Sequence, residues 1–452
     1  MKKIAVLGAG SWGTALSLVL VRKGYQVHLW GRNQEKVVQI NLLKENLPYL
    51  PGVLLPENLQ VTANLEEALA DKKYIVLAVP SRRIRGLCKS IIDKISKDKI
   101  IINAAKGIEL ETLKRMSDVI EEELAPVGPA VAIISGPSHA EEVGRGIPTA
   151  LVIGSKNSKV AKEVQDLFMS PNFRVYTNSD LIGMEYGAAL KNVIALGVGI
   201  ATGVGLGDNA KAALITRGLT EIARLGVAAG ANPLTFAGLT GIGDLVVTCA
   251  SEYSRNRRAG IQIGKGIPLK HVLQQINMAV EGVPATQAAC QLAGKYKVPM
   301  PICEEIYAVL FRNKDVHEAS NALMMRDRKD EVEGIMSQRQ VEDSNKDTTK
   351  KSSAKSGKSS KSSTSSTKDN KKSSAKSSKS ATKKSSAKSD KGSKSSTSST
   401  KDNKKSSAKS SKSATKKSSA KSDKSSKSST SSIKDTTKKS SAKSSSKSKK
   451  TK

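Results

Sequence analysis

The sequence "AVLGAGSWGTALS", residues 5–17, joins a short apolar run to a second one through three glycines with the spacing G-x-G-x-x-G. In a strand–turn–helix unit, the first glycine (Gly8) permits the tight turn and Gly10 lets a pyrophosphate approach the backbone. Gly13 lets the helix pack closely on the strand. The N–H groups at the start of such a helix face the phosphates. The stretch therefore predicts a dinucleotide site, and the alternative is a glycine-rich turn without a ligand.

Apolar runs of strand length recur through the first half of the chain and alternate with stretches of helical spacing. This alternation predicts a mostly parallel sheet with helices on its faces. The expected strands are Ile4–Leu7, Val27–Trp30, Tyr74–Val79, Ile100–Ile102, Val131–Ile134, Leu151–Ile153 and Phe173–Tyr176. Ligands bind beyond the carboxyl ends of such strands, and glycine, small polar and cationic residues follow them here, at 8–13, 31–32, 80–81, 104–107 and 136–138.

Strand signals stop after about Ile182, and helical patterns follow at Leu181–Leu206, Ala212–Leu225, Arg257–Ile263, Pro284–Tyr296, Cys303–Leu310 and Val316–Met325. Between them we expect two loops, at 238–244 and 253–258. The fold class predicted is a Rossmann-like α/β domain over residues 1–182 and an all-α domain over residues 183–335. A linker and a disordered tail over residues 336–452 would follow.

The tail differs from the rest of the chain in composition. Residues 346–452 hold 34 Lys and 6 Asp, and therefore carry +28 of the formal net charge of +34. A stretch of 25 residues that begins at Thr367 recurs at Thr400, and almost nothing larger than Ala is present to bury. The segment therefore reads as low-complexity and disordered, and charge alone predicts non-specific binding to nucleic acid or an anionic membrane. The alternative is a solvated appendage spread by repeat slippage.

Targeting and metal signals are weak. The four cysteines form no C-x-x-C pair and the four histidines are scattered, so we expect reduced thiols and no metal site. The apolar run Val193–Leu206 is shorter than the roughly 20 residues that cross a bilayer. These features predict a soluble, cytoplasmic protein.

The residue after the second expected strand bears on cofactor choice. A fold that prefers NAD usually has Asp or Glu there, bonded to the ribose 2′-hydroxyl, whereas this chain has Gly31 and then Arg32. A cation without an acid favours a 2′-phosphate. We therefore expect NADPH or NADP to be preferred to NADH or NAD, unless Arg32 is only a solvated surface residue.

Two further motifs suggest a reaction. Lys191 interrupts a run of apolar and small residues from Gly187 to Gly207, and partial burial would lower the pKa of its amine. Such a lysine could donate the proton that a carbonyl reduction requires, and Asp244 could orient it. Ser254-Arg255-Asn256 combines a guanidinium with two hydrogen-bonding side chains, which suits a phosphate or, equally, a basic helix cap.

Together these segments resemble the bacterial NAD(P)-dependent glycerol-3-phosphate dehydrogenases. The resemblance covers about residues 1–330 and rests on "VLGAGSWGTALS", "LPYLPGVLLPENLQVT", "AAKGIE", "SGPSHAEE", "GAALKNVIALGVGI", "TRGLTEIARLG", "TFAGLTGIGDLVVTC", "SEYSRNRRAG" and "VEGVPAT", in that order. It implies the same two-domain fold and the interconversion of dihydroxyacetone phosphate and sn-glycerol 3-phosphate, which supplies phospholipid synthesis. The tail has no counterpart in the family pattern.

The resemblance also implies roles for individual residues. Lys191 matches the proton-transferring lysine, and Lys106 would add positive charge beside the reacting oxygen. The implied substrate-binding residues are Lys106, Gly136, Ser138, Lys191, Asp244, Ser254, Arg255 and Asn256. With the glycine turn, the implied cofactor-binding residues are Gly8, Gly10, Ser11, Trp12, Gly13, Arg32, Lys106, Ala140, Arg255, Ala279 and Glu281; the family often has Val at the position of Ala279.

Other functions and assemblies stay open on the sequence alone. A related two-domain hydroxyacid dehydrogenase would share the glycine turn and the lysine, but "GIGDLVVTC" followed by "YSRNRR" argues against it. A polyanion-binding protein with a vestigial enzyme domain would explain the tail, but intact Lys191 and Asp244 argue against lost activity. The sequence does not determine the oligomeric state, for which our hypothesis is a homodimer.

Overall fold

The computed structural model describes residues 1–276, 278–328 and 331. Its first half is built on an eight-stranded sheet with the order β10-β9-β8-β7-β6-β1-β2-β5. All neighbouring strands are parallel except β8 and β9, which are antiparallel. The strands are β1 Lys3–Leu7, β2 Gln26–Trp30, β5 Leu59–Thr62, β6 Tyr74–Leu77, β7 Ile100–Asn103, β8 Ala130–Ser135, β9 Thr149–Gly154 and β10 Phe173–Asn178.

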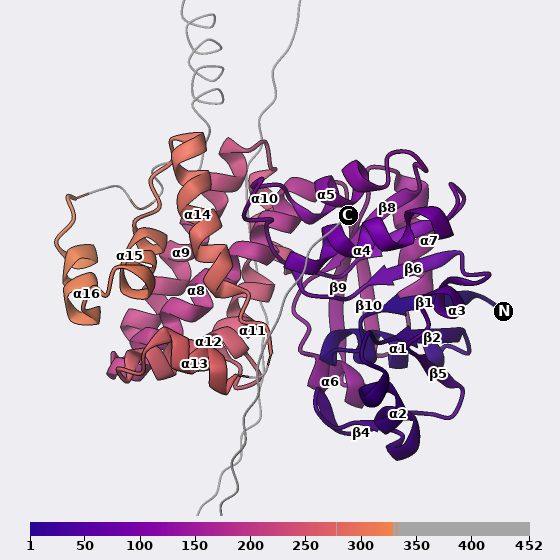
Figure 1. The fold of residues 1–452 in the computed structure, drawn as a ribbon. Helices are drawn as coiled ribbons and strands as arrows, with labels where there is room; N and C mark the ends of the chain where they lie inside the picture. The colour runs from indigo at the N-terminus through magenta and orange to yellow at the C-terminus, as the bar shows by residue number, and fades with distance from the viewer. Residues whose placement is uncertain (277, 329–330, 332–452) are drawn as a thin grey trace, which may run out of the picture. The chain divides into compact units, whose positions relative to one another are not determined.

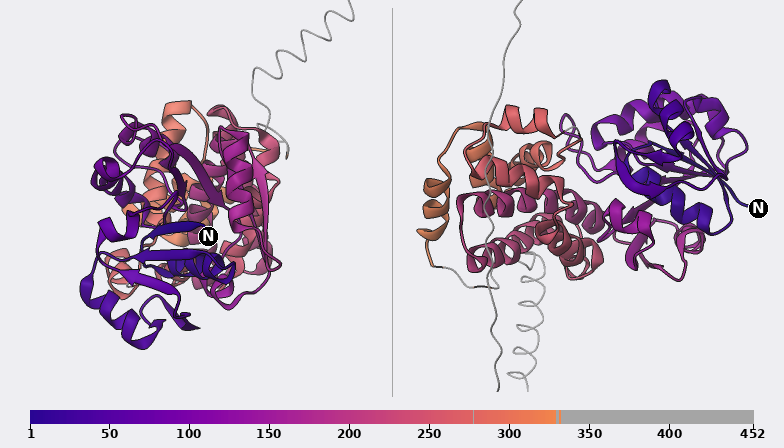
Figure 2. Two further views of the ribbon diagram at one scale, coloured as in Figure 1. Left: turned by 90° about the vertical axis from the view of Figure 1, so that its right-hand side faces the viewer. Right: turned by 90° about the horizontal axis from the view of Figure 1, so that it is seen from below.

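Alternation along the strands explains why helices cover both faces of the sheet (Figures 1 and 2). On β1, Ile4 and Val6 belong to one apolar core, and Ala5 and Leu7 belong to the other. The helices of this half are α1 Ser11–Arg22, α2 Gln34–Leu43, α3 Leu65–Leu69, α4 Ile84–Ile91, α5 Met116–Glu123, α6 Ala140–Arg145 and α7 Ser158–Phe168, with 3₁₀ turns at Ser81–Arg83 and Ile92–Lys94. A small hairpin joins β3 Glu45–Asn46 to β4 Leu50–Leu54.

The second half is helical, as Figure 1 shows for α8 to α16. Its helices are α8 Leu181–Val204, α9 Asp208–Ala228, α10 Pro233–Phe236, α11 Asp244–Ala250, α12 Arg255–Gly264, α13 Leu269–Gln275, α14 Gly282–Tyr296, α15 Pro301–Phe311 and α16 Val316–Met324, with a π-helical turn at Leu239–Gly243. Together, the sheet and these helices confirm the predicted fold class. The tail lies outside the described residues.

Helix α8 is the centre of the helical half. Among described helices, two segments are long and apolar enough by composition to cross a bilayer: α8, whose most apolar window is 83% buried within the protein, and Pro233–Ala250, with 44% buried. The predicted apolar run Val193–Leu206 begins inside α8, a helix of 24 residues, and extends two residues beyond its end at Val204. Because its side chains pack against neighbouring helices on almost every side, α8 has the surroundings of a core helix.

Helices α8 and α12 approach each other so closely that glycine is required on both. A Cβ at Gly260 would lie 2.1 Å from the carbonyl oxygen of Leu196, and one at Gly199 would lie 2.2 Å from backbone of α12. The same closeness recurs one turn further on, at Gly203 and Gly264. This contact fixes the start of α12 beside the middle of α8.

Replacing Gly260 by alanine should therefore destabilise the protein by about 2 kcal/mol or more, because overpacking forces the two backbones apart. Gly294 in α14 is the matched control, since a Cβ there would meet nothing within 4 Å. Gly294→Ala should be neutral or stabilising by up to about 1 kcal/mol. Denaturant unfolding of both variants measures the difference, and equal free energies of unfolding would contradict this account of the α8–α12 contact.

Candidate active site

The glycine turn after β1 has the geometry of a dinucleotide site. Gly8 has a φ of +127°, and a Cβ there would lie 2.6 Å from the carbonyl oxygen of Ala78. At Gly10, by contrast, a Cβ would meet nothing within 4 Å, so this side of the turn is open. No side chain caps the start of α1 at Ser11. Its first N–H groups therefore remain available to a phosphate, and the turn fits the pyrophosphate of a dinucleotide.

A buried carboxylate joins two lysines where the two halves meet. Asp244 Oδ2 accepts from Lys106 Nζ at 2.7 Å, and Asp244 Oδ1 accepts from Lys191 Nζ at 2.6 Å. Lys106 follows β7 and also donates to the carbonyl oxygen of Gly136 at 2.9 Å. Asp244 is 1% exposed and Lys191 is 6% exposed. The structure thus brings together four residues that the sequence predicted for the substrate.

Asp244 is the first residue of helix α11, whereas the sequence predicted it in a loop. The glycine-rich stretch before it forms the π-helical turn, so its glycines shape a helix entry. One helical turn later, Thr248 Oγ1 accepts from Lys191 Nζ at 2.6 Å and donates to the carbonyl oxygen of Asp244 at 2.6 Å. The sequence analysis missed Thr248. Residues four apart lie on one face only in a helix, and no helix was predicted after Asp244.

These contacts constrain the amine of Lys191. An ammonium has three N–H donors, and Asp244 and Thr248 take two of them. The third has no hydrogen-bond partner among the residues that the structure describes. Lys191 can therefore offer one proton to a bound substrate while the other two hold it in place.

Burial sets the charges of this cluster. It lowers the pKa of Lys191 to about 8, and the neighbouring Lys106 lowers it further while Asp244 opposes both. Burial alone would raise the pKa of Asp244, but the two lysines hold it below its usual range. His139 lies nearby, and burial together with the charge of Lys191 lowers its pKa to about 4. At neutral pH the cluster therefore holds an ionised carboxylate, an unusually acidic ammonium and a neutral imidazole.

The start of α12 places a second group of predicted residues beside α8. Ser254 Oγ caps α12 by accepting from the Arg257 amide at 3.2 Å. Asn256 Nδ2 donates to Asn192 Oδ1 at 2.8 Å, which joins the first turn of α12 to the residue that follows Lys191. Asn192 was not predicted, although it follows Lys191 directly in the sequence.

Arg255 and its neighbours form the first turn of a helix, where the sequence predicted a loop. Arg255 Nη1 donates to the carbonyl oxygen of Ala279 at 3.0 Å. Burial lowers the pKa of the Arg255 guanidinium, and Glu281 opposes that shift. The remaining guanidinium donors suit a phosphate oxygen.

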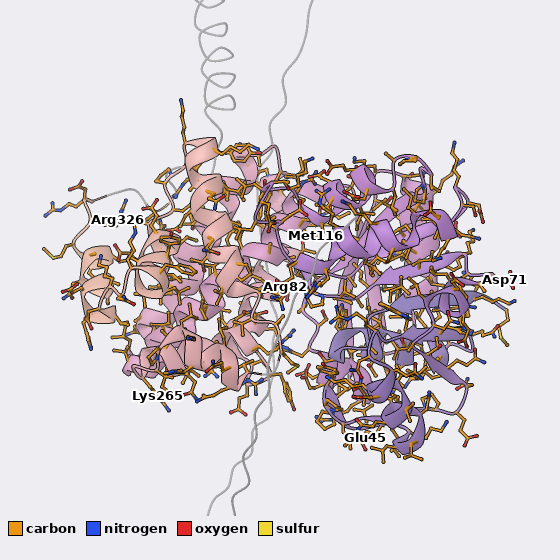
Figure 3. The ribbon with its side chains drawn as sticks, viewed as in Figure 1. Glu45, Asp71, Arg82, Met116, Lys265 and Arg326 are labelled. Atoms are coloured by element: carbon orange, nitrogen blue, oxygen red, sulfur yellow. The ribbon has the colours of Figure 1, made fainter. Side chains whose placement is uncertain are left out.

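Glu281 connects the two halves at another point. Its carboxylate accepts from the Ser81 amide at 3.2 Å and from Ser81 Oγ at 2.7 Å. Ser81 follows β6, at the strand edge where ligands were predicted, but it was not singled out. The adjacent Arg82 is exposed and lies where the two halves meet (Figure 3).

The remaining predicted residues lie around this edge without joining the lysine cluster. Ser138 Oγ donates to the carbonyl oxygen of Gly136 at 2.9 Å, and Ala140 begins α6. Arg32 is exposed just beyond β2. Trp12 Nε1 is buried without a hydrogen-bond partner among the described residues.

The fold and this cluster define a class: a two-domain, nicotinamide-dependent dehydrogenase with a lysine at the domain junction. Comparison with protein families narrows it. Residues 3–161 match the N-terminal domain of NAD-dependent glycerol-3-phosphate dehydrogenase, and residues 180–321 match its C-terminal domain. The chain therefore belongs to the NAD-dependent glycerol-3-phosphate dehydrogenase family.

Individual proteins agree with this assignment. The chain is 52% identical over 333 residues to the NAD(P)+ glycerol-3-phosphate dehydrogenase of Fusobacterium nucleatum, covering 74% of this chain and 99% of the relative. It is 54% identical over 332 residues to that of Moorella thermoacetica, covering 74% and 98%. A crystal structure of glycerol-3-phosphate dehydrogenase from Coxiella burnetii matches with a TM-score of 0.69 and 39% identity, covering 72% of this chain and 99% of that one.

Proposed function

We propose that this chain catalyses the reversible reduction of dihydroxyacetone phosphate to sn-glycerol 3-phosphate with NADPH or NADH. One observation carries the proposal: Lys191 is buried, its amine has a pKa of about 8, and it shares the carboxylate of Asp244 with Lys106. Family membership supports the substrate. A hydroxyacid dehydrogenase is disfavoured by that membership, and a vestigial domain by the assembled lysine cluster.

For each residue we propose the role that the resemblance to the family implies. Gly8, Gly10 and Gly13 would form the pyrophosphate turn. The other proposed cofactor contacts are Ser11, Trp12, Arg32, Lys106, Ala140, Arg255, Ala279 and Glu281. The proposed substrate contacts are Lys106, Gly136, Ser138, Lys191, Asp244, Ser254, Arg255 and Asn256. We also propose the domain limits 1–182 and 183–335.

NADPH or NADH supplies the hydride that reduces C2 of the substrate. Lys191 donates the proton of its third N–H group to the oxygen on that carbon. Its lowered pKa makes the amine a stronger acid than that of an ordinary lysine, and the amine stays mostly protonated at pH 7. Lys106 adds positive charge beside the same oxygen. Asp244 and Thr248 orient the amine of Lys191 toward that oxygen through their hydrogen bonds. Arg255 and Asn256 hold the phosphate and so fix the position of the carbonyl.

The pH dependence of the rate tests this role. For reduction Lys191 must be protonated, so kcat/KM should fall as pH rises through about 8, and for oxidation it should rise through the same pH. Lys191→Ala should lower kcat by about 10² to 10⁴ and abolish this limb. Lys106→Met removes a charge that lowers the pKa of Lys191, so the limb should move to higher pH. A folded Lys191→Ala variant with near-normal turnover would overturn the mechanism.

Arg32 tests the proposed preference for NADPH. If its guanidinium binds the 2′-phosphate, Arg32→Ala should reduce kcat/KM with NADPH by about tenfold to a hundredfold, the worth of a charge-assisted contact. The value with NADH should change little, because NADH lacks that phosphate. Steady-state assays with both cofactors make the comparison, and equal losses would show that Arg32 does not recognise the phosphate.

We propose the cellular setting from the resemblance to the family. The product would supply phospholipid synthesis, and the enzyme would work in the cytoplasm. We propose a homodimer as its assembly, with the Lys/Ser tail as a polyanion-binding appendage outside the catalytic fold. The composition of residues 346–452, rich in Lys and Ser and without aromatic residues, supports binding that depends on charge and not on base sequence.

Removing residues 346–452 tests the appendage. The truncated chain should keep kcat and KM, since the proposed site lies within residues 8–282. The full chain should bind DNA with an affinity that falls steeply with salt, at a log–log slope of about −0.9 per phosphate neutralised, and truncation should abolish that binding. Equal, weak binding of both forms to DNA and to anionic vesicles at physiological salt would refute the proposal.

A further inference from the structure

Tyr253 lies directly before the proposed phosphate-binding residues and contacts the opposite half of the protein. Its ring centroid is 6.0 Å from that of His139, with the planes tilted by 54°, which is a favourable distance for an aromatic pair. Its hydroxyl accepts from Arg145 Nη1 at 3.2 Å. Tyr253 is 39% exposed, and its contacts with His139 and Arg145 hold this partly exposed side chain in place.

Both contacts come from the two ends of α6. His139 is the residue before this helix, and Arg145 is its last residue. His139 also follows Gly136–Ser138, which belong to the proposed substrate site, and its Nε2 lies 3.4 Å from the carbonyl oxygen of Val247 in α11. The connection from α11 to α12 is thus attached to α6 at two places.

The connection is compact enough to transmit this attachment to α12. The Tyr253 amide donates to Ser251 Oγ at 3.1 Å, and the Ser254 amide donates to the Ser251 carbonyl oxygen at 3.2 Å. Ser254 then caps α12. A shift of Tyr253 would therefore move the first turn of α12, which carries Arg255 and Asn256.

We propose that Tyr253 is a positioning residue, held by His139 and Arg145, that fixes the first turn of α12 relative to Gly136–Ser138. The inference rests on the proposed function, since the group positioned is the substrate phosphate. His139 suits this part because its imidazole is neutral at physiological pH and so adds no charge beside Lys191. Its Nε2 can then donate to Val247 while its ring meets Tyr253.

Kinetics with and without the phosphate separate positioning from general damage. Tyr253→Ala in the full chain should lower kcat/KM for dihydroxyacetone phosphate by about 5- to 30-fold, mainly through KM. With phosphate-free dihydroxyacetone the change should stay below about twofold. Tyr176→Ala, at an exposed tyrosine on β10, is the control and should leave both substrates unaffected.

Further variants separate the contribution of the Arg145 hydrogen bond from that of the His139 ring contact. Tyr253→Phe keeps the ring and loses only the Arg145 bond, so it should cost about two- to tenfold in kcat/KM. Arg145→Ala should cost the same, and the two changes together should cost no more than either alone, because both remove one interaction. Additive losses, or equal losses with dihydroxyacetone and its phosphate, would overturn the proposal.

Hydrogen exchange gives a measurement that does not depend on the reaction. In Tyr253→Ala the Arg257 amide, which Ser254 caps, should exchange at least about tenfold faster than in the unaltered chain, whereas amides within α8 should not change. If the unaltered chain does not reduce dihydroxyacetone phosphate, the proposed function fails, and the exchange rates still decide the role of Tyr253. Unchanged exchange at Arg257 would reject that role.

Discussion

The carboxylate of Asp244, buried between two lysine amines, is the interaction on which the site depends. Burying one charge in a protein interior is costly, and breaking a buried ion pair leaves an uncompensated charge. Here one carboxylate satisfies two ammonium groups from different halves of the protein. These contacts offset the cost of burying the charges. They also align the sheet edge with α8 and keep Lys191 within a narrow range of positions.

The cluster needs rigid support, and the helical half supplies it through the α8–α12 contact. The glycines at that crossing bring the two backbones together, so that Asn192 and Asn256 can bond directly. Gly282 adds a third element, since its amide donates to Asn256 Oδ1 at 2.9 Å. The proposed acid–base and phosphate-binding groups thus share one scaffold, and the distance between them is set by backbone packing.

Much of the architecture could be predicted from the sequence because its signals are local. The buried strands read as continuous apolar runs, and all seven expected strands were confirmed. Strand β5 was missed because Leu59–Thr62 is short and its pattern alternates, and the hairpin strands β3 and β4 were missed as well. Helix α11 was missed because its entry is rich in glycine, a residue typical of loops.

The site could be predicted only in part, for a related reason. Lys191 and Asp244 are conspicuous as charged residues among apolar or glycine-rich neighbours. Thr248 and Ser81 have ordinary surroundings in sequence, and their roles come from contacts across 57 and 200 residues. Such pairings depend on tertiary structure, which no local pattern encodes.

The most direct test of the account is the ionisation of Lys191 itself. Carbon-13 labelling of lysine side chains, with Lys191→Arg to assign the signal, allows its pKa to be measured by NMR titration. The account predicts a value of about 8 in the folded protein. A value near 10.5, that of an ordinary exposed lysine, would show that burial does not tune this amine and would contradict the proposed proton donor.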